Sequence, residues 1–115
     1  MKEIIAILRP ASWQKTKQAL LEGGFPSFTV HRVYGRGKQK GLRYLSKTGS
    51  LEEGIFFLPK RMVTIFLEEP AVDSCIQIIT KINKTGAIGD GKIFVLSLGD
   101  VERIRTGEKG SNALI

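Results

Sequence analysis

The chain has 115 residues, of which 42% are hydrophobic, and it therefore predicts one compact domain around a single core. Its formal charge of +7 and its pI near 9.8 favour an anionic partner: nucleotide, organic acid, phospholipid or nucleic acid. One cysteine and one histidine exclude an internal disulfide and a zinc site built from clustered soft ligands. No apolar run approaches the roughly 18 residues of a membrane span, and no signal-peptide pattern follows Met1, so we expect a cytoplasmic protein.

The first predicted element is a strand over residues 3–9, a run too apolar to alternate. It suits a central strand covered on both faces or buried in an oligomer, and Pro10 ends it. A helix is predicted from an N-cap at Ser12 to about Glu22, closed by Gly23 and Gly24. Its core-facing side chains recur at helical spacing: Trp13, Thr16, Ala19 and Leu20.

A second strand follows Pro26 and runs out near Gly35, with His31 on its open face. Its candidate buried positions are Phe28, Val30 and Val33. Residues 37 to about 57 then lack sustained periodicity, and such a long run inside a compact domain is expected to be functional or disordered. Either reading predicts a mobile loop. The stretch from 32 to 47 is also basic, with no acidic residue: Arg32, Arg36, Lys38, Lys40, Arg43 and Lys47.

The third strand is predicted over residues 61–67, and Pro70 suits the first turn of a second helix. That helix has one apolar stripe at intervals of three and four: Val72, Cys75, Ile76, Ile79 and Ile82. Cys75 therefore reads as core, and Gly86 stands where a C-terminal glycine belongs. A fourth strand runs from Lys92 to about Leu98, and residues from about 100 to 115 form a poorly patterned tail.

The order strand, helix, strand, strand, helix, strand predicts a ferredoxin-like βαββαβ sandwich of the α+β class. Two helices cover only one face of a four-stranded sheet. Because the strands are rich in Ile, Val and Phe, we expect the other face to be buried against further subunits, in a homo-oligomer.

The densest chemical signal lies in residues 85–95, which have the character of a polyphosphate cradle leading into a strand. Gly86, Gly89 and Gly91 permit positive φ angles and close approach of a ligand to the backbone, and Lys92 adds a point charge. Successive backbone N–H groups in such a turn can converge on an anion. The alternative is structural: Gly86 ends a helix, and Asp90 and Gly91 form an ordinary turn.

Four segments, residues 35–41, 58–60, 85–95 and 103–108, resemble in order and spacing the motifs of the PII signal-transduction proteins. The resemblance covers nearly the whole chain. It implies a ferredoxin-like trimer, or a hetero-oligomer with a paralogue, whose clefts between subunits bind ATP or ADP. It further implies that 2-oxoglutarate joins Mg-ATP there, and that the long loop docks on target proteins.

The resemblance also assigns residues to these ligands. One subunit would supply the phosphate side: Ile7, Gly35, Gly37, Lys38, Gln39, Gly89, Asp90, Gly91 and Lys92. Its neighbour would supply the base and ribose contacts, and two arginines for the phosphates: Phe28, Thr29, Thr64, Phe66, Arg103 and Arg105. The effector would be held by Arg9, Gln39, Lys60 and Gly89. Gln39 would also bind the magnesium ion between the phosphates and the keto acid.

The resemblance is greatest to the branch that controls nitrogenase, and the alternative target is an ammonium transporter, which would recruit the protein reversibly to the membrane. Another regulatory enzyme of nitrogen metabolism is a further candidate target. The loop lacks the tyrosine near its tip that is uridylylated in one family member, because residues 48–54 contain none. Tyr44 lies too early to replace it, and Ser50 is the candidate by analogy with a phosphorylated branch. We predict no modification site.

Two other classes of function fit this element order. RNA-recognition domains share it, but residues 91–96 and 34–37 miss most of the aromatic pattern that stacks bases, so we expect no nucleic-acid partner. A small phosphohydrolase would use Arg9 or Lys92 to bind phosphate. No activated nucleophile or paired carboxylates accompany these cations, so we expect no enzyme.

Overall fold

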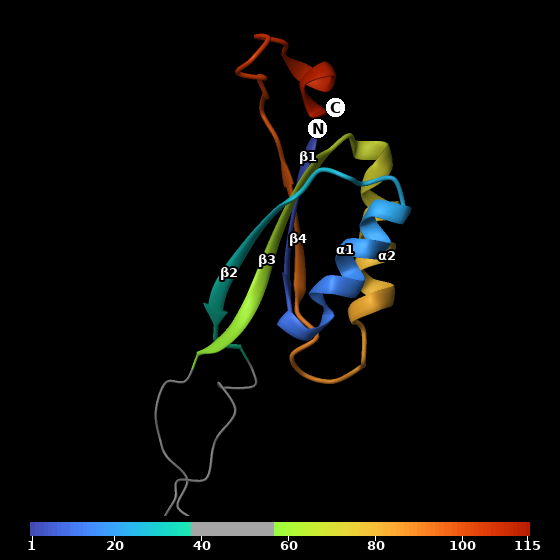
Figure 1. Ribbon diagram of the computed structural model, residues 1–115, viewed down its shortest axis with the longest axis vertical. Coiled ribbons are helices and arrows are strands. Elements are labelled where there is room, and N and C mark those ends of the chain that lie inside the picture. The colour runs from blue at the N-terminus through green and yellow to red at the C-terminus, as the bar shows by residue number, and fades with distance from the viewer. Residues whose placement is uncertain (38–56) are drawn as a thin grey trace, which may run out of the picture.

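The computed structural model describes residues 1–37 and 57–115, and Figure 1 shows a curved sheet with two helices packed against one side. The elements follow in the predicted order: β1 (Lys2–Leu8), α1 (Trp13–Glu22), β2 (Thr29–Gly35), β3 (Leu58–Leu67), α2 (Val72–Asn83) and β4 (Lys92–Ser97). Short 3₁₀ turns precede α1 and α2, at Pro10–Ser12 and Glu69–Ala71, and another spans Gly110–Leu114.

The four strands lie in the order β2-β3-β1-β4, and each neighbouring pair is antiparallel. β1 and β3 therefore form the centre of the sheet, while β2 and β4 are its edges. This order, with α1 and α2 on one face, confirms the predicted ferredoxin-like α+β fold (Figure 1).

The core lies between the sheet and the two helices. Alternate residues of β1 are buried there, and Ile4 and Ala6 pair with the buried Ile65 and Val63 of β3. The buried apolar side chains are Ile4, Ala6, Leu8, Leu20, Val63, Ile65, Leu67, Cys75 and Ile79. Cys75 is part of this core as predicted, and burial raises the pKa of its thiol to about 11, so it stays neutral.

A buried polar contact joins the two helices. Asn83 donates from Nδ2 to the hydroxyl of Thr16 at 2.9 Å and to the carbonyl of Ile79 at 2.8 Å. The Thr16 hydroxyl in turn donates to the carbonyl of Ser12 at 2.7 Å. These bonds hold the last turn of α2 against the first turn of α1, where both side chains are removed from water.

Several local predictions are corrected by the structure. Ser12 makes no side-chain capping hydrogen bond, because α1 continues directly from the 3₁₀ turn that begins at Pro10. β2 begins after Phe28, although this ring still packs on the core. Val33 pairs with Lys60 on the open face and is not a core residue. β3 begins three residues before the predicted start, at Leu58.

Two further corrections concern the second half of the chain. α2 ends at Asn83, and the extended backbone of Lys84 follows it, so Gly86 is not the helix C-cap. Its positive φ of 86° belongs to the next turn. The tail is also more regular than predicted, because Glu102 bridges Lys109 in a hairpin and residues 110–114 form a 3₁₀ turn.

The second face of the sheet is apolar and carries no helix, as predicted (Figure 1). Ile5 and Ile7 of β1 point to this side, opposite to the buried alternate residues. Phe66 is 43% exposed, Phe94 48% and Leu96 41%. Burial of this face against other subunits stays a prediction. Neither helix in the described part of the chain has the length and apolarity that crossing a bilayer requires.

The contact between α1 and α2 can be tested by Asn83→Ala. We expect the free energy of unfolding to fall by about 1 to 2 kcal/mol, because two buried hydrogen bonds are lost while an amide oxygen without a donor is removed as well. Urea unfolding measures the change. Gln77→Ala, at an exposed position of the same helix, is the control and should stay within about 0.5 kcal/mol. Equal effects of both substitutions would contradict this account.

Candidate functional site

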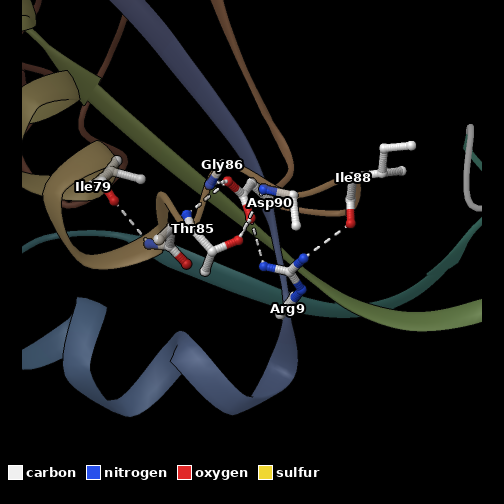
Figure 2. Close-up of polar contacts among 8 residues, drawn as sticks. Arg9, Ile79, Thr85, Gly86, Ile88 and Asp90 are labelled. Carbon is white, nitrogen blue, oxygen red and sulfur yellow. Dashed lines mark hydrogen bonds and ion pairs between the residues drawn. The ribbon is translucent and has the colours of Figure 1, made fainter.

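The loop between α2 and β4 is organised around the carboxylate of Asp90. Asp90 Oδ2 accepts from the N–H groups of Thr85 at 2.7 Å and Gly86 at 2.9 Å. Asp90 Oδ1 accepts from the Thr85 hydroxyl and from Arg9 Nη1, the latter at 2.8 Å. Arg9 Nη2 also donates to the carbonyl of Ile88 at 3.1 Å. Figure 2 shows these contacts closing the loop against the end of β1.

Hydrogen bonds from the hydroxyl and N–H of Thr85, followed by the bond from Arg9, hold the pKa of Asp90 well below its usual range. The carboxylate is therefore charged at neutral pH. The convergence of N–H groups predicted for this turn is present, but the anion that the first two of them bind is the chain's own Asp90. The third, from Ala87, donates to the Thr85 hydroxyl at 3.2 Å. The donors that remain for an outside anion belong to residues 88 to 91.

Gly91 is where this loop passes closest to β1. Its φ is 103°, and a Cβ built on it would stand 1.9 Å from the carbonyl oxygen of Ile7. Only glycine permits both the backbone conformation and the approach. The glycines were predicted to let a ligand approach the backbone closely. At Gly91 the group that approaches is the protein's own β1.

Three cations meet where the loop joins the sheet. The register of β1 and β3 ends with Leu8 opposite Arg61, so Arg9 and Lys60 follow at the same end of the sheet, and Lys92 stands opposite Ile7 at the start of β4. Burial, and then the charge of Arg9, lower the pKa of Lys60. The stem of Lys60 passes Gly35, where an added Cβ would lie 3.6 Å from Lys60 Cγ. Arg9, Lys60, Lys92 and Gly35, predicted as ligand contacts, thus come together at one end of the sheet.

The residues predicted for the base and ribose gather at the other end. Phe28, Thr29, Thr64 and Phe66 line a hollow of about 470 Å³. The ring of Phe28 also meets Trp13 edge to face, with centroids 5.5 Å apart. The remaining walls come from the segment before β2 and from the C-terminal residues: Pro26, Ser27, Val101, Ala113, Leu114 and Ile115. Sequence reasoning missed these C-terminal wall residues.

Of the two predicted phosphate-binding arginines, Arg103 has protein partners. Its Nη1 pairs with Glu108 Oε1 at 2.9 Å, and its Nη2 donates to the carbonyls of Asn112 and Ile115. Arg105 is exposed on the same hairpin. Sequence reasoning treated the two as equivalent, although the five-residue spacing of Arg103 and Glu108 around Gly107 could have indicated a closed hairpin.

The two groups of predicted ligand residues are separated along the sheet. β4 begins at Lys92 beside the loop and ends at Ser97, a rise of about 20 Å for six extended residues. At that far end Leu98 donates to the carbonyl of Met1, and residues 101–115 continue beyond it. Figure 1 shows the 84–91 loop and the C-terminal segment at opposite ends of the molecule.

Lys38 and Gln39, predicted for the nucleotide and, in the case of Gln39, for magnesium and the effector, lie outside the described residues. So do Lys40, Tyr44 and Ser50. Gly37 is exposed at the border of the described part. Within residues 1–37 and 57–115, no three acidic, histidine or cysteine side chains gather as a metal site. The predicted role of Gln39 therefore stays a prediction.

The described part of the chain is a small ferredoxin-like α+β domain with cations collected at both ends of its sheet. The family model of nitrogen regulatory protein P-II matches residues 1–108, and the chain belongs to this family. This confirms the predicted resemblance to the PII proteins, including the branch linked to nitrogen fixation.

The similar proteins cover the full length of the chain. It is 46% identical over 121 residues to the nitrogen fixation nifHD region GlnB-like protein 2 of Methanothermobacter marburgensis, with 99% of this chain and 100% of that protein aligned. It is 43% identical to the nitrogen regulatory protein P-II of Mesorhizobium japonicum, over 99% of this chain and 100% of that protein. The solved structure of Arabidopsis thaliana PII bound to citrate superposes with a TM-score of 0.76 at 36% identity, over 98% and 88% of the two chains.

Substitution of Gly91 tests the contact between the loop and β1. Gly91→Ala should lower the free energy of unfolding by about 3 kcal/mol or more, because the new Cβ overlaps the Ile7 carbonyl and the positive φ is strained. Chemical denaturation measures the loss. Gly99→Ala, with no atom within 4 Å of its added Cβ, should change stability by no more than about 0.5 kcal/mol. A Gly91→Ala protein as stable as the Gly99→Ala control would disprove the close contact.

The charge of Asp90 predicts a pH dependence. An unperturbed aspartate has a pKa of about 3.9, and the folded value is lower. The stabilisation is therefore complete above pH 4 and is lost as the pH falls through the lower, folded value. Urea midpoints at about pH 6 and pH 2.5 should differ less for Asp90→Asn than for the wild type. Asp73→Asn, on exposed α2 surface, should keep the wild-type difference, and the same behaviour of both variants would refute the role of Asp90.

Proposed function

We propose that the protein is a non-catalytic sensor of nitrogen, carbon and energy status. It binds ATP or ADP and 2-oxoglutarate in clefts between the subunits of a trimer. The bound ligands set the posture of the loop at about 37–57, and this loop regulates a target protein of nitrogen metabolism. The observation that carries the proposal is that the described residues predicted for the nucleotide form two groups, which lie at opposite ends of the sheet.

The separation of these halves supports a site shared between subunits. Hydrogen bonds and ion pairs reach only about 3 to 4 Å, whereas β4 alone keeps Lys92 about 20 Å from the C-terminal segment. Phosphates that contact Lys92 therefore take their Arg103 and Arg105 contacts from another copy. The uncovered apolar sheet face supplies a surface on which such copies can associate.

The cations at the loop end support an anionic effector. Burial, and then the charge of Arg9, lower the pKa of Lys60, so these two cations lie close enough to repel each other. A dicarboxylate such as 2-oxoglutarate relieves this repulsion, and Gly35 leaves room beside the Lys60 stem. The related Arabidopsis thaliana PII is bound to citrate, another small polycarboxylate.

Asp90 does not serve as a magnesium ligand in this proposal. Its two oxygens already accept four hydrogen bonds, from Thr85, Gly86 and Arg9, and these bonds shape the loop. The magnesium ion would instead be held by the nucleotide phosphates, the keto acid and Gln39, in keeping with its preference for oxygen ligands and few protein contacts.

The nitrogen-fixation relatives support nitrogenase as the target, and a cytoplasmic location follows from that target. Two of these relatives, from Methanothermobacter marburgensis and Methanothermococcus thermolithotrophicus, are named for the nifHD region. The basic residues at the loop base, Arg32 and Arg36, give this end of the molecule a charge suited to an acidic surface on the target.

Calorimetric titration tests the ligand assignment. We expect ATP to bind, and 2-oxoglutarate to bind strongly only when ATP and magnesium are present, because the metal joins nucleotide to effector. Lys92→Ala should weaken ATP binding roughly 10- to 100-fold, the range for loss of a charge-assisted hydrogen bond. Lys81→Ala, exposed on α2, is the charge-matched control and should bind ATP like the wild type.

Two results would count against the proposal. If 2-oxoglutarate bound equally well with and without nucleotide, the two ligands would not share a site. If Lys92→Ala and Lys81→Ala lowered the affinity for ATP equally, the role of Lys92 would be only a general attraction between opposite charges. Tight oligonucleotide binding without ATP binding would favour the nucleic-acid alternative instead.

A further inference from the structure

Residues 101–115 form a hydrogen-bonded hairpin followed by a 3₁₀ turn. Arg103 N–H donates to the Glu108 carbonyl at 2.9 Å, and Gly107 N–H donates to the Arg103 carbonyl at 2.7 Å. Gly107 adopts a φ of 73°, which closes this turn. Gly110 N–H then donates to the carbonyl of Val101 at 3.1 Å, so the chain turns back toward β2 and β3.

The guanidinium of Arg103 holds this structure together. Glu108 Oε1 lies 2.9 Å from Nη1, and the carbonyl of Asn112 lies 2.9 Å from Nη2, which also donates to the carbonyl of Ile115. The side chains of Arg103 and Glu108 are 25% and 44% exposed, so the pair lies at the surface, next to the segment that it anchors.

The anchored segment forms one wall of the hollow described above. Leu114 and Ile115 line that hollow together with Thr29, Thr64 and Phe66, the residues proposed to contact the base and ribose. The position of Arg103 therefore bears on the nucleotide pocket in two ways. It holds a wall of the pocket, and it is also one of the two arginines proposed for the phosphates.

We infer that Glu108 is a further residue of the nucleotide site and tunes its affinity for polyphosphate by competing for Arg103. This inference rests on the proposed function. A phosphate that approaches the guanidinium must displace the Glu108 carboxylate, because two anions beside one cation repel each other. Nucleotide binding and the ion pair between Arg103 and Glu108 thus oppose each other, and each weakens the other by the same free energy.

Arg105 provides the contrast within the same hairpin. It is exposed, and it makes no ion pair with the described residues, so its charge is open to a phosphate from the start. Nη1 of Arg103, by contrast, becomes open to a phosphate only when Glu108 is displaced. The net free energy of an exposed ion pair is small, so ATP binding can break the pair between Arg103 and Glu108. The free energy needed to break it makes ATP binding weaker by the same amount. Adenosine lacks phosphates and leaves the pair intact.

Two variants that remove the same charge test this competition. Glu108→Gln removes the carboxylate that pairs with Arg103. Glu102→Gln removes another carboxylate of the same hairpin, and this carboxylate makes no ion pair with the described residues. Calorimetry with ATP and with adenosine gives the affinities. Trp13, the only tryptophan of the chain, touches Phe28 of the hollow and reports folding and pocket occupancy by fluorescence.

We expect Glu108→Gln to bind ATP about two- to fivefold more tightly than the wild type, the range that an exposed ion pair accounts for. Its affinity for adenosine should not rise, and Glu102→Gln should show neither change. Two results would overturn the competition and leave the proposed function intact, provided that the wild-type protein binds ATP. One is an equal change in ATP affinity in the Glu108→Gln and Glu102→Gln proteins, and the other is a gain in adenosine affinity as large as the gain in ATP affinity. Absence of ATP binding by the wild-type protein would overturn the proposed function and this inference with it.

Discussion

The ion pair between Arg9 and Asp90 is the contact on which the loop before β4 depends. It joins the end of β1 to the loop before β4, two segments that are 81 residues apart in the chain. Asp90 also collects the hydrogen bonds of Thr85 and Gly86, so the loop is shaped by its own internal anion. With this loop held against Ile7, Lys92 starts β4 beside the two cations of β1 and β3. This charged contact therefore holds Arg9 and the loop together, while strand pairing positions Lys60 and Lys92.

The residues proposed for one nucleotide site form two groups, at opposite ends of the sheet. Cations and glycines lie where β1 ends, and the aromatic hollow with Arg103 lies where β1 begins. Copies that share their apolar sheet faces can bring unlike ends together, which explains why so small a domain keeps exposed phenylalanines on a strand. A site completed only by association couples ligand binding to the arrangement of subunits.

Much of the fold and part of the candidate site could be predicted from the sequence. The apolar stripe of α2, with Cys75 inside it, is a local pattern, and so is the run that forms β1. The predictions failed where a local signal had a nonlocal competitor. Gly86 serves the Asp90 turn instead of ending α2, and Val33 alternates onto the open face because its register with Lys60 decides its direction. The tail seemed patternless because its order comes from one guanidinium and two backbone turns.

By itself the sequence determined the order of elements, the buried stripe, the glycine and lysine motif and the excess of positive charge, since these depend on residues that are neighbours along the chain. Only the tertiary structure decided which groups meet. The approach of Arg9 to Lys60 follows from strand register, and a shift of one residue would place them on opposite faces. The loop at Asp90 likewise acquires its partner, Arg9, from the segment after β1, and the hollow at Phe28 acquires a wall from residues 113–115. Such contacts depend on chain packing, which local spacing does not encode.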